Sequence, residues 1–138
     1  MARAGGDVDC FYTHRAYSHG MQFVEARAFT AHLADYLDDE AYRRLQVYLM
    51  TNPDAGDVIP DAGGLRKLRW ADGRRGKGRR GGLRVVYLWI TWDQTIWFLA
   101  IYDKDEATDL STQQRKALRT MVEAELAARR RPQQRKKS

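Results

Sequence analysis

Two apolar segments near the middle of the chain place the strongest constraint on its fold. Leu83–Ile90 contains one charged residue, Arg84, and residues 96–102 contain none. Only residues 91–95 separate the two segments, a connection short enough for antiparallel neighbours in a sheet. Because almost every position is apolar, each segment is typical of a strand buried in the centre of a sheet. The pattern therefore predicts a buried β-hairpin at the centre of the domain.

Weaker patterns on both sides of this hairpin predict the remaining elements. Residues 22–26 and 65–71 have the composition of strands, and residues 56–64 read as a loop. Three further segments repeat apolar residues at helical spacing, and Ser111 and Gln114 form a capping box at the start of the last. The repeated residues are Phe29, Leu33, Tyr36 and Leu37, then Tyr42, Leu45, Tyr48 and Leu49, then Leu118, Met121, Val122 and Leu126. We therefore predict an α+β domain, a small antiparallel β-sheet packed with two N-terminal helices and a C-terminal helix.

The two ends of the chain differ from its middle. Residues 1–20 show neither helical nor strand periodicity, and we predict a disordered N-terminal extension there. Residues 127–138 carry six cations and no core-forming residue, and we predict a disordered basic tail. One domain over residues 21–126 accounts for the rest, as expected for a chain of 138 residues.

Positive charge is concentrated in one part of the sequence. Residues 63–104 contain ten Lys or Arg against three Asp or Glu, whereas residues 21–62 contain three against eight. Five of the cations, Arg74, Arg75, Lys77, Arg79 and Arg80, lie in a glycine-rich segment between two predicted strands. Such a cationic band on a β-scaffold predicts a surface that binds a polyphosphate chain.

Side-chain alternation predicts which of the other cations share a face. In residues 65–71, Lys67 and Arg69 point to one side of the strand, and Arg66 points to the other with the apolar residues. Lys67 and Arg69 are therefore expected on an open face. Arg84 could pair across strands with Asp103, but a functional role is favoured because a lone charge in an apolar strand is costly to bury.

Several classes of protein do not fit this sequence. No apolar run approaches eighteen residues, and residues 1–20 lack the apolar core of a signal peptide, so we expect no membrane partner. Cys10 is the only cysteine, which rules out an intrachain disulfide and suits the cytoplasm. Cys10, His14 and His19 are too loosely spaced to predict a zinc site. We expect neither a metal nor another cofactor.

Three blocks in the sequence resemble one known family. They are NPDAGDVIPDAGGLRKLRWA, GKGRRGGLRVVYLW and IYDKDEATDLS, and they occur in this order within residues 21–126. In these blocks the chain resembles the RelE/HigB superfamily of type II toxins, and the HigB-like branch especially. The resemblance implies a ribosome-dependent mRNA endonuclease, or mRNA interferase, that inhibits translation. It also implies two partners, the ribosome with bound mRNA and a cognate helix-turn-helix antitoxin protein.

The resemblance also implies which residues act. Lys67 and Arg69 match the basic strand positions, Arg84 matches the arginine of the G-x-R-x-x-Y strand, and Lys104 follows the last strand where the family often has a cation. These four are the catalytic candidates. The candidates for contacting RNA or the ribosome are Arg66, Arg74, Arg75, Lys77, Arg79 and Arg80.

The sequence does not assign the residues that accept and donate protons in the reaction. RelE has a tyrosine in its C-terminal region that contributes to cleavage, and residues 110–126 here contain none. Lys67 or Lys104 could act as base or acid, with Asp103, Asp105 and Glu106 as carboxylate alternatives. Without a metal, cleavage would use the RNA 2′-hydroxyl as an internal nucleophile.

A second class of function is compatible with the same pattern. A catalytically silent toxin or binding module on this fold, such as a ParE-like inhibitor of DNA gyrase, would also need a basic surface. Convergence of Lys67, Arg69, Arg84 and Lys104 favours the endonuclease, because a module that only binds has no need of cations converging on the sheet.

Overall fold

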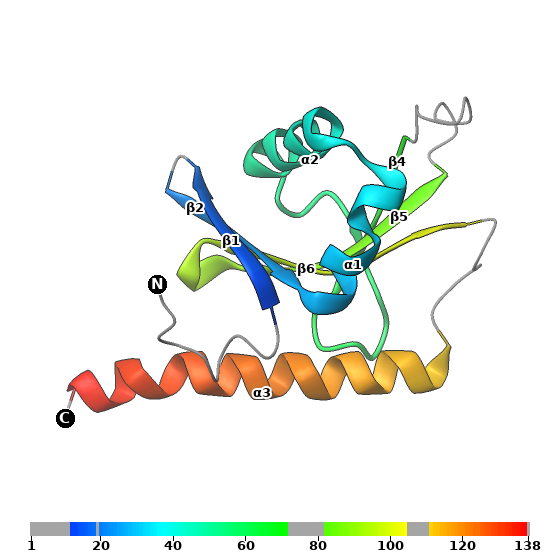
Figure 1. Ribbon diagram of the computed structural model, residues 1–138. Coiled ribbons are helices and arrows are strands. Elements are labelled where there is room, and N and C mark those ends of the chain that lie inside the picture. The colour runs from blue at the N-terminus through cyan, green and yellow to red at the C-terminus, as the bar shows by residue number, and fades with distance from the viewer. Residues whose placement is uncertain (1–11, 19, 72–81, 105–110, 138) are drawn as a thin grey trace.

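The fold is seen in a computed structural model that describes residues 12–18, 20–71, 82–104 and 111–137. Six strands form one sheet in the order β1-β2-β6-β5-β4-β3, with three helices packed around it (Figure 1). The strands are β1 (Tyr12–Ser18), β2 (Met21–Ala26), β3 (Asp57–Val58), β4 (Arg66–Trp70), β5 (Leu83–Ile90) and β6 (Thr95–Asp103). The helices are α1 (Arg27–Tyr36), α2 (Asp39–Thr51) and α3 (Thr112–Lys137). The predicted α+β class is confirmed.

The predicted hairpin forms the centre of the sheet. β5 and β6 pair antiparallel along their whole length, with a register shift between Val86 and Tyr87, and a 3-10 turn at Thr91–Asp93 joins them. Tyr87 and Trp97 are fully buried although they face opposite sides of the sheet, in separate apolar clusters. The two central strands are therefore covered on both faces, as their apolar sequences require.

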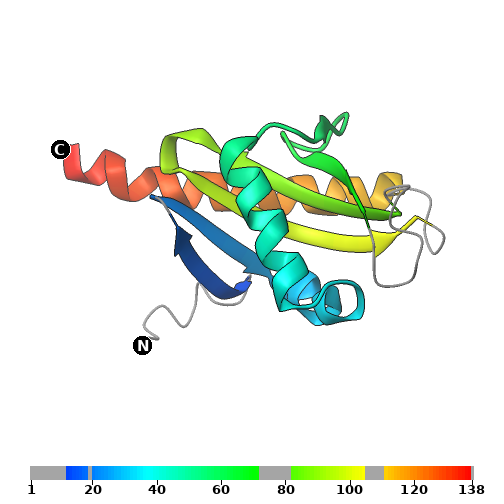
Figure 2. The ribbon, with the colours of Figure 1, turned by 90° about the horizontal axis from the view of Figure 1, so that it is seen from above.

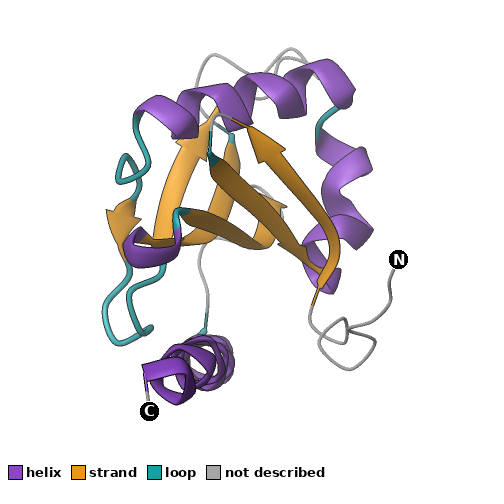
Figure 3. Cartoon of the chain, turned by 90° about the vertical axis from the view of Figure 1, so that its left-hand side faces the viewer, coloured by secondary structure: helices purple, strands orange, loops and turns teal. Residues whose placement is uncertain are grey.

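The helices provide this cover as two layers. α1 and α2 lie on one face of the sheet and α3 lies on the other (Figure 3). Viewed from above, α2 crosses over the strands of the sheet (Figure 2). Phe98 stacks against Phe29 of α1, with ring centroids 4.8 Å apart, and Val122 of α3 is fully buried against the opposite face. The middle of the sheet therefore belongs to two hydrophobic cores.

The prediction of a purely antiparallel sheet is wrong. β2 runs parallel to β6, from the pair Gln22 and Thr95 to the pair Glu25 and Phe98. α1, α2, β3, β4 and β5 lie between these two strands in the chain, and a long connection of this kind permits parallel pairing. Apolar patterning reports which faces of a strand are buried, but it carries no information about the direction of the neighbouring strand.

The chain also has more regular structure than predicted. Residues 12–18, placed in a disordered extension, form the edge strand β1, where Ser18 lies opposite Met21. Gly20, at φ 79°, suits the tight connection between β1 and β2. Residues 56–64, predicted as a loop, include the short strand β3 opposite β4.

The prediction of a disordered tail is also wrong, because α3 continues to Lys137. Alanine and arginine are good helix formers, so a segment with no core residue can still extend an established helix. Arg129 also holds this part of α3 to the protein. Its guanidinium pairs with Asp93 of the 3-10 turn, and its Nε lies 3.0 Å from a carboxylate oxygen of Glu125. Among the described helices, none has the length and apolar character that crossing a bilayer demands.

Candidate phosphate-binding cavity

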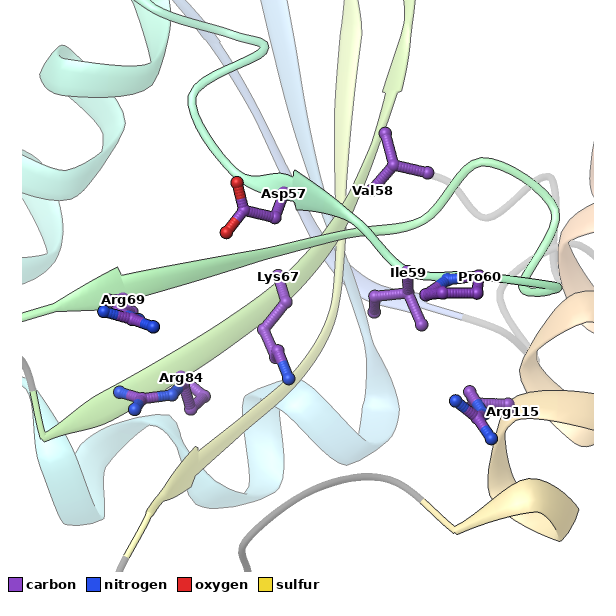
Figure 4. A pocket seen from close by; sticks show the side chains of 8 residues that line it. All are labelled: Asp57, Val58, Ile59, Pro60, Lys67, Arg69, Arg84 and Arg115. Atoms are coloured by element: carbon purple, nitrogen blue, oxygen red, sulfur yellow. The ribbon is translucent and has the colours of Figure 1, made fainter.

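A cavity of about 310 Å³ opens on the α3 side of the sheet, between β3, β4, β5 and the start of α3 (Figure 4). Among the described residues, four cations and one acid contribute charged side chains to it. The lining residues are Asp57, Val58, Ile59, Pro60, Lys67, Arg69, Arg84 and Arg115. Its size suits a phosphate group with part of a nucleotide rather than a long polymer segment.

Strand alternation brings three of the cations together. Leu68 packs into the core beneath α1 and α2, so its neighbours Lys67 and Arg69 face the cavity. The β4–β5 register places Arg69 directly opposite Arg84. Like charges opposite one another in a sheet repel and are destabilising. An anion bound between the two guanidinium groups would relieve this repulsion, and each planar group can donate two hydrogen bonds to phosphate oxygens.

The fourth cation, Arg115, comes from the start of α3. The predicted capping box is confirmed: the Ser111 N–H donates to the Gln114 side chain at 2.8 Å, and the Gln114 N–H donates to Ser111 Oγ at 3.1 Å. Gly63, at φ 74°, lets the chain before β4 approach α3 closely, because a β-carbon there would lie 3.3 Å from Arg119. Arg119 is one turn beyond Arg115, so this contact holds Arg115 beside the cavity.

The acid, Asp57, stands opposite Lys67 in the β3–β4 register. The segment before it is held from two sides. The buried Tyr87 hydroxyl donates to the Pro53 carbonyl at 2.8 Å and accepts from the Gly56 N–H at 3.0 Å. Burial raises the pKa of Tyr87, so this hydroxyl stays protonated and able to donate.

Arg66 completes this support. Its guanidinium donates to the Asp54 carbonyl at 3.1 Å and to the Gly56 carbonyl at 2.8 Å. Gly56 itself packs tightly, since a β-carbon there would lie 3.1 Å from the Lys67 backbone and from the Tyr87 ring. The chain therefore enters β3 along a fixed path.

The predicted site residues that the structure describes divide into three groups. Lys67, Arg69 and Arg84 line one cavity, and for Lys67 and Arg69 the shared face is the one that alternation predicted. Arg66 faces the other side of the sheet, where it supports the loop before β3. Lys104 is exposed at the end of β6, outside the cavity lining, and its N–H donates to the Gly82 carbonyl at 2.9 Å.

The remaining candidates are placed as follows. Arg74, Arg75, Lys77, Arg79 and Arg80 lie outside the described residues, as do Asp105 and Glu106. Asp103 is buried opposite Leu83, while Arg84 lies opposite Tyr102, so the register does not align Arg84 with Asp103. Within the described part of the chain, no three His, Cys, Asp or Glu residues gather as metal ligands.

Sequence reasoning missed two charged residues of the cavity, Asp57 and Arg115. Asp57 was assigned to a loop, although a strand assignment for residues 57–58 would have placed it on the Lys67 face. Arg115 carried no signal of its own, because it is one of several exposed-looking cations on α3.

No protein-family model matches this chain.

Proposed function

We propose that the protein is the toxin of a type II toxin–antitoxin system and acts as a ribosome-dependent, metal-independent mRNA endonuclease. The observation that supports this best is the cavity in which Lys67, Arg69, Arg84 and Arg115 converge from two strands and a helix. Convergence on one small volume suits a single phosphate in a reaction, whereas a surface for electrostatic attachment only needs its charges spread along a path. The resemblance of residues 21–126 to RelE/HigB toxins supports the particular reaction and the particular partners.

The proposed reaction is an internal transesterification of RNA. The 2′-oxygen attacks the adjacent phosphorus, the bond from phosphorus to the 5′-oxygen breaks, and a 2′,3′-cyclic phosphate remains. Negative charge grows on the phosphate oxygens as five groups crowd around phosphorus. Fixed cations aimed at those oxygens therefore stabilise the transition state more than the ground state.

Each cation has a distinct part in this reaction. Arg84 and Arg69, opposite one another, hold the non-bridging phosphate oxygens with their planar groups. Arg115 reaches the same phosphate from α3. Lys67 is the proton donor for the departing 5′-oxygen, because an ammonium can release a proton far more readily than a guanidinium.

The ribosome is needed to position the RNA chain at the cavity. A cavity of this size holds little of an RNA chain, so it cannot by itself arrange the 2′-oxygen in line with the leaving group. The cations of residues 74–80 remain candidates for contacting ribosomal RNA, and their role is a prediction from charge alone.

The purified protein is expected to cut mRNA on programmed ribosomes and to leave the same mRNA intact when ribosomes are absent. The measurement is primer extension on both samples over a time course. Supercoiling by DNA gyrase, assayed with the same preparation, should be unaffected. Inhibition of gyrase without any mRNA cleavage would instead support the silent, ParE-like alternative.

A further inference from the structure

Among the described residues that line the cavity, Asp57 is the one carboxylate. It lies opposite Lys67 in the β3–β4 register, so the two side chains leave the sheet on the same face and at close range. Arg69, Arg84 and Arg115 face the same space from β4, β5 and α3. Figure 4 shows Asp57 at the edge of this group of cations.

A site that only binds phosphate would be better without this acid. A carboxylate repels an anionic ligand and partly cancels the field of the four cations. As a structural ion pair it would contribute little, because Asp57 is exposed and exposed pairs add little to stability. Its position therefore calls for a chemical explanation.

The contacts that fix the chain before Asp57 also favour a chemical role for this residue. The preceding segment is fixed by the buried hydroxyl of Tyr87, by the guanidinium of Arg66 and by the close packing of Gly56. Three separate contacts thus hold the segment that leads directly into β3, a strand of only two residues at the exposed edge of the sheet. Groups that transfer protons need this kind of fixed placement, because the rate depends steeply on geometry.

We propose that Asp57 is the general base of the reaction, the group that removes the proton from the 2′-hydroxyl. In this step the proton passes to a carboxylate oxygen of Asp57 while the 2′-oxygen forms its bond to phosphorus. As the bond to the 5′-oxygen breaks, the Lys67 ammonium gives that oxygen a proton. Solvent water then carries a proton from the neutral Asp57 carboxyl to Lys67, which restores both groups. This assignment rests on the proposed endonuclease function.

The test compares Asp57→Asn with wild type in single-turnover cleavage of mRNA on ribosomes. We expect the cleavage rate to fall at least about 100-fold, within the range for loss of a general base. Binding to programmed ribosomes should be unchanged or tighter, because the variant removes a negative charge from the cavity. Asp57→Ser is a second variant without a carboxylate and should behave alike, and Asp57→Glu should recover part of the rate. Asp54→Asn is the matched control, since it neutralises another exposed acid of the same loop outside the cavity, and it should cleave as wild type does.

A modified substrate separates the base from the acid. Sulfur in place of the 5′-oxygen at the cut site leaves without needing a proton, so it should restore most of the rate to Lys67→Ala but none to Asp57→Asn. Cleavage by Asp57→Asn within about threefold of wild type, or rescue of Asp57→Asn by the sulfur substrate, would overturn the assignment. If the wild-type protein does not cleave mRNA, the proposed endonuclease function is wrong. If the wild type cleaves and Asp57→Asn cleaves equally well, only the role of Asp57 is wrong.

Discussion

Replacing Arg84 with alanine is expected to lower single-turnover cleavage of ribosome-bound mRNA by about 10²–10³-fold, the usual cost of losing one fixed donor to a transition-state oxyanion. Arg84 lines the cavity from β5 and lies opposite Arg69, so its loss removes one of the two planar groups that would hold the phosphate. Its side chain is only half-buried, and the fold should survive the change. Expression of the variant should no longer arrest growth.

Two control variants define this effect. Arg84→Lys keeps the charge but loses the planar fork, and it should recover only part of the rate. Arg43→Ala removes the same charge from an exposed position on α2 and should leave cleavage unchanged. Full cleavage by a folded Arg84→Ala protein, verified by its circular dichroism spectrum, would refute the role of Arg84.

Replacing Phe98 with alanine is expected to lower the free energy of unfolding by about 3–5 kcal/mol. Phe98 is fully buried, and its ring centroid lies 4.8 Å from that of Phe29 and 6.0 Å from that of Phe23. It therefore joins β6 to β2 and to α1. The loss combines the transfer of a large apolar group with a cavity that the surrounding strands cannot easily close.

Urea titration followed by circular dichroism measures this loss. Phe98→Leu should cost much less than alanine because it fills most of the space. Val47→Ala, at an exposed position of α2, should change stability by less than about 0.5 kcal/mol. A Phe98→Ala protein as stable as wild type would contradict the packing of α1 and β6 around this ring.

The sequence predicted those parts of the fold that depend on patterns among neighbouring residues. The apolar segments around Arg84 identified the central hairpin, and Ser111 with Gln114 identified the start of α3. The parallel pairing of β2 with β6 joins residues 73 positions apart, as in Gln22 and Thr95, and no local pattern records it. β1 was missed because an edge strand held through backbone hydrogen bonds needs no apolar alternation.

The candidate site was also predictable only where it depends on local sequence. Alternation along β4 correctly separated Lys67 and Arg69 from Arg66, because side-chain direction follows from strand geometry alone. Asp57 reaches the same cavity from a strand of two residues, too short to leave a strand pattern in the sequence. Arg115 reaches it from α3, which is distant in sequence, so only the assembled sheet and helix bring it there. The support of Asp57 by Tyr87 likewise depends on a contact between residues 31 positions apart, that of the Gly56 N–H with the hydroxyl.

The central claim is that the cavity promotes attack by the RNA's own 2′-oxygen, and the chemistry of the cut ends tests it most directly. Ribosomes are programmed with two mRNAs that differ only in a 2′-deoxy nucleotide on the 5′ side of the cut site, and the products are analysed by mass spectrometry. The account predicts a 2′,3′-cyclic phosphate and a free 5′-hydroxyl from the normal mRNA, and no cleavage of the deoxy-substituted one. A product with a 3′-hydroxyl and a 5′-phosphate, or equal cleavage of both mRNAs, would contradict it.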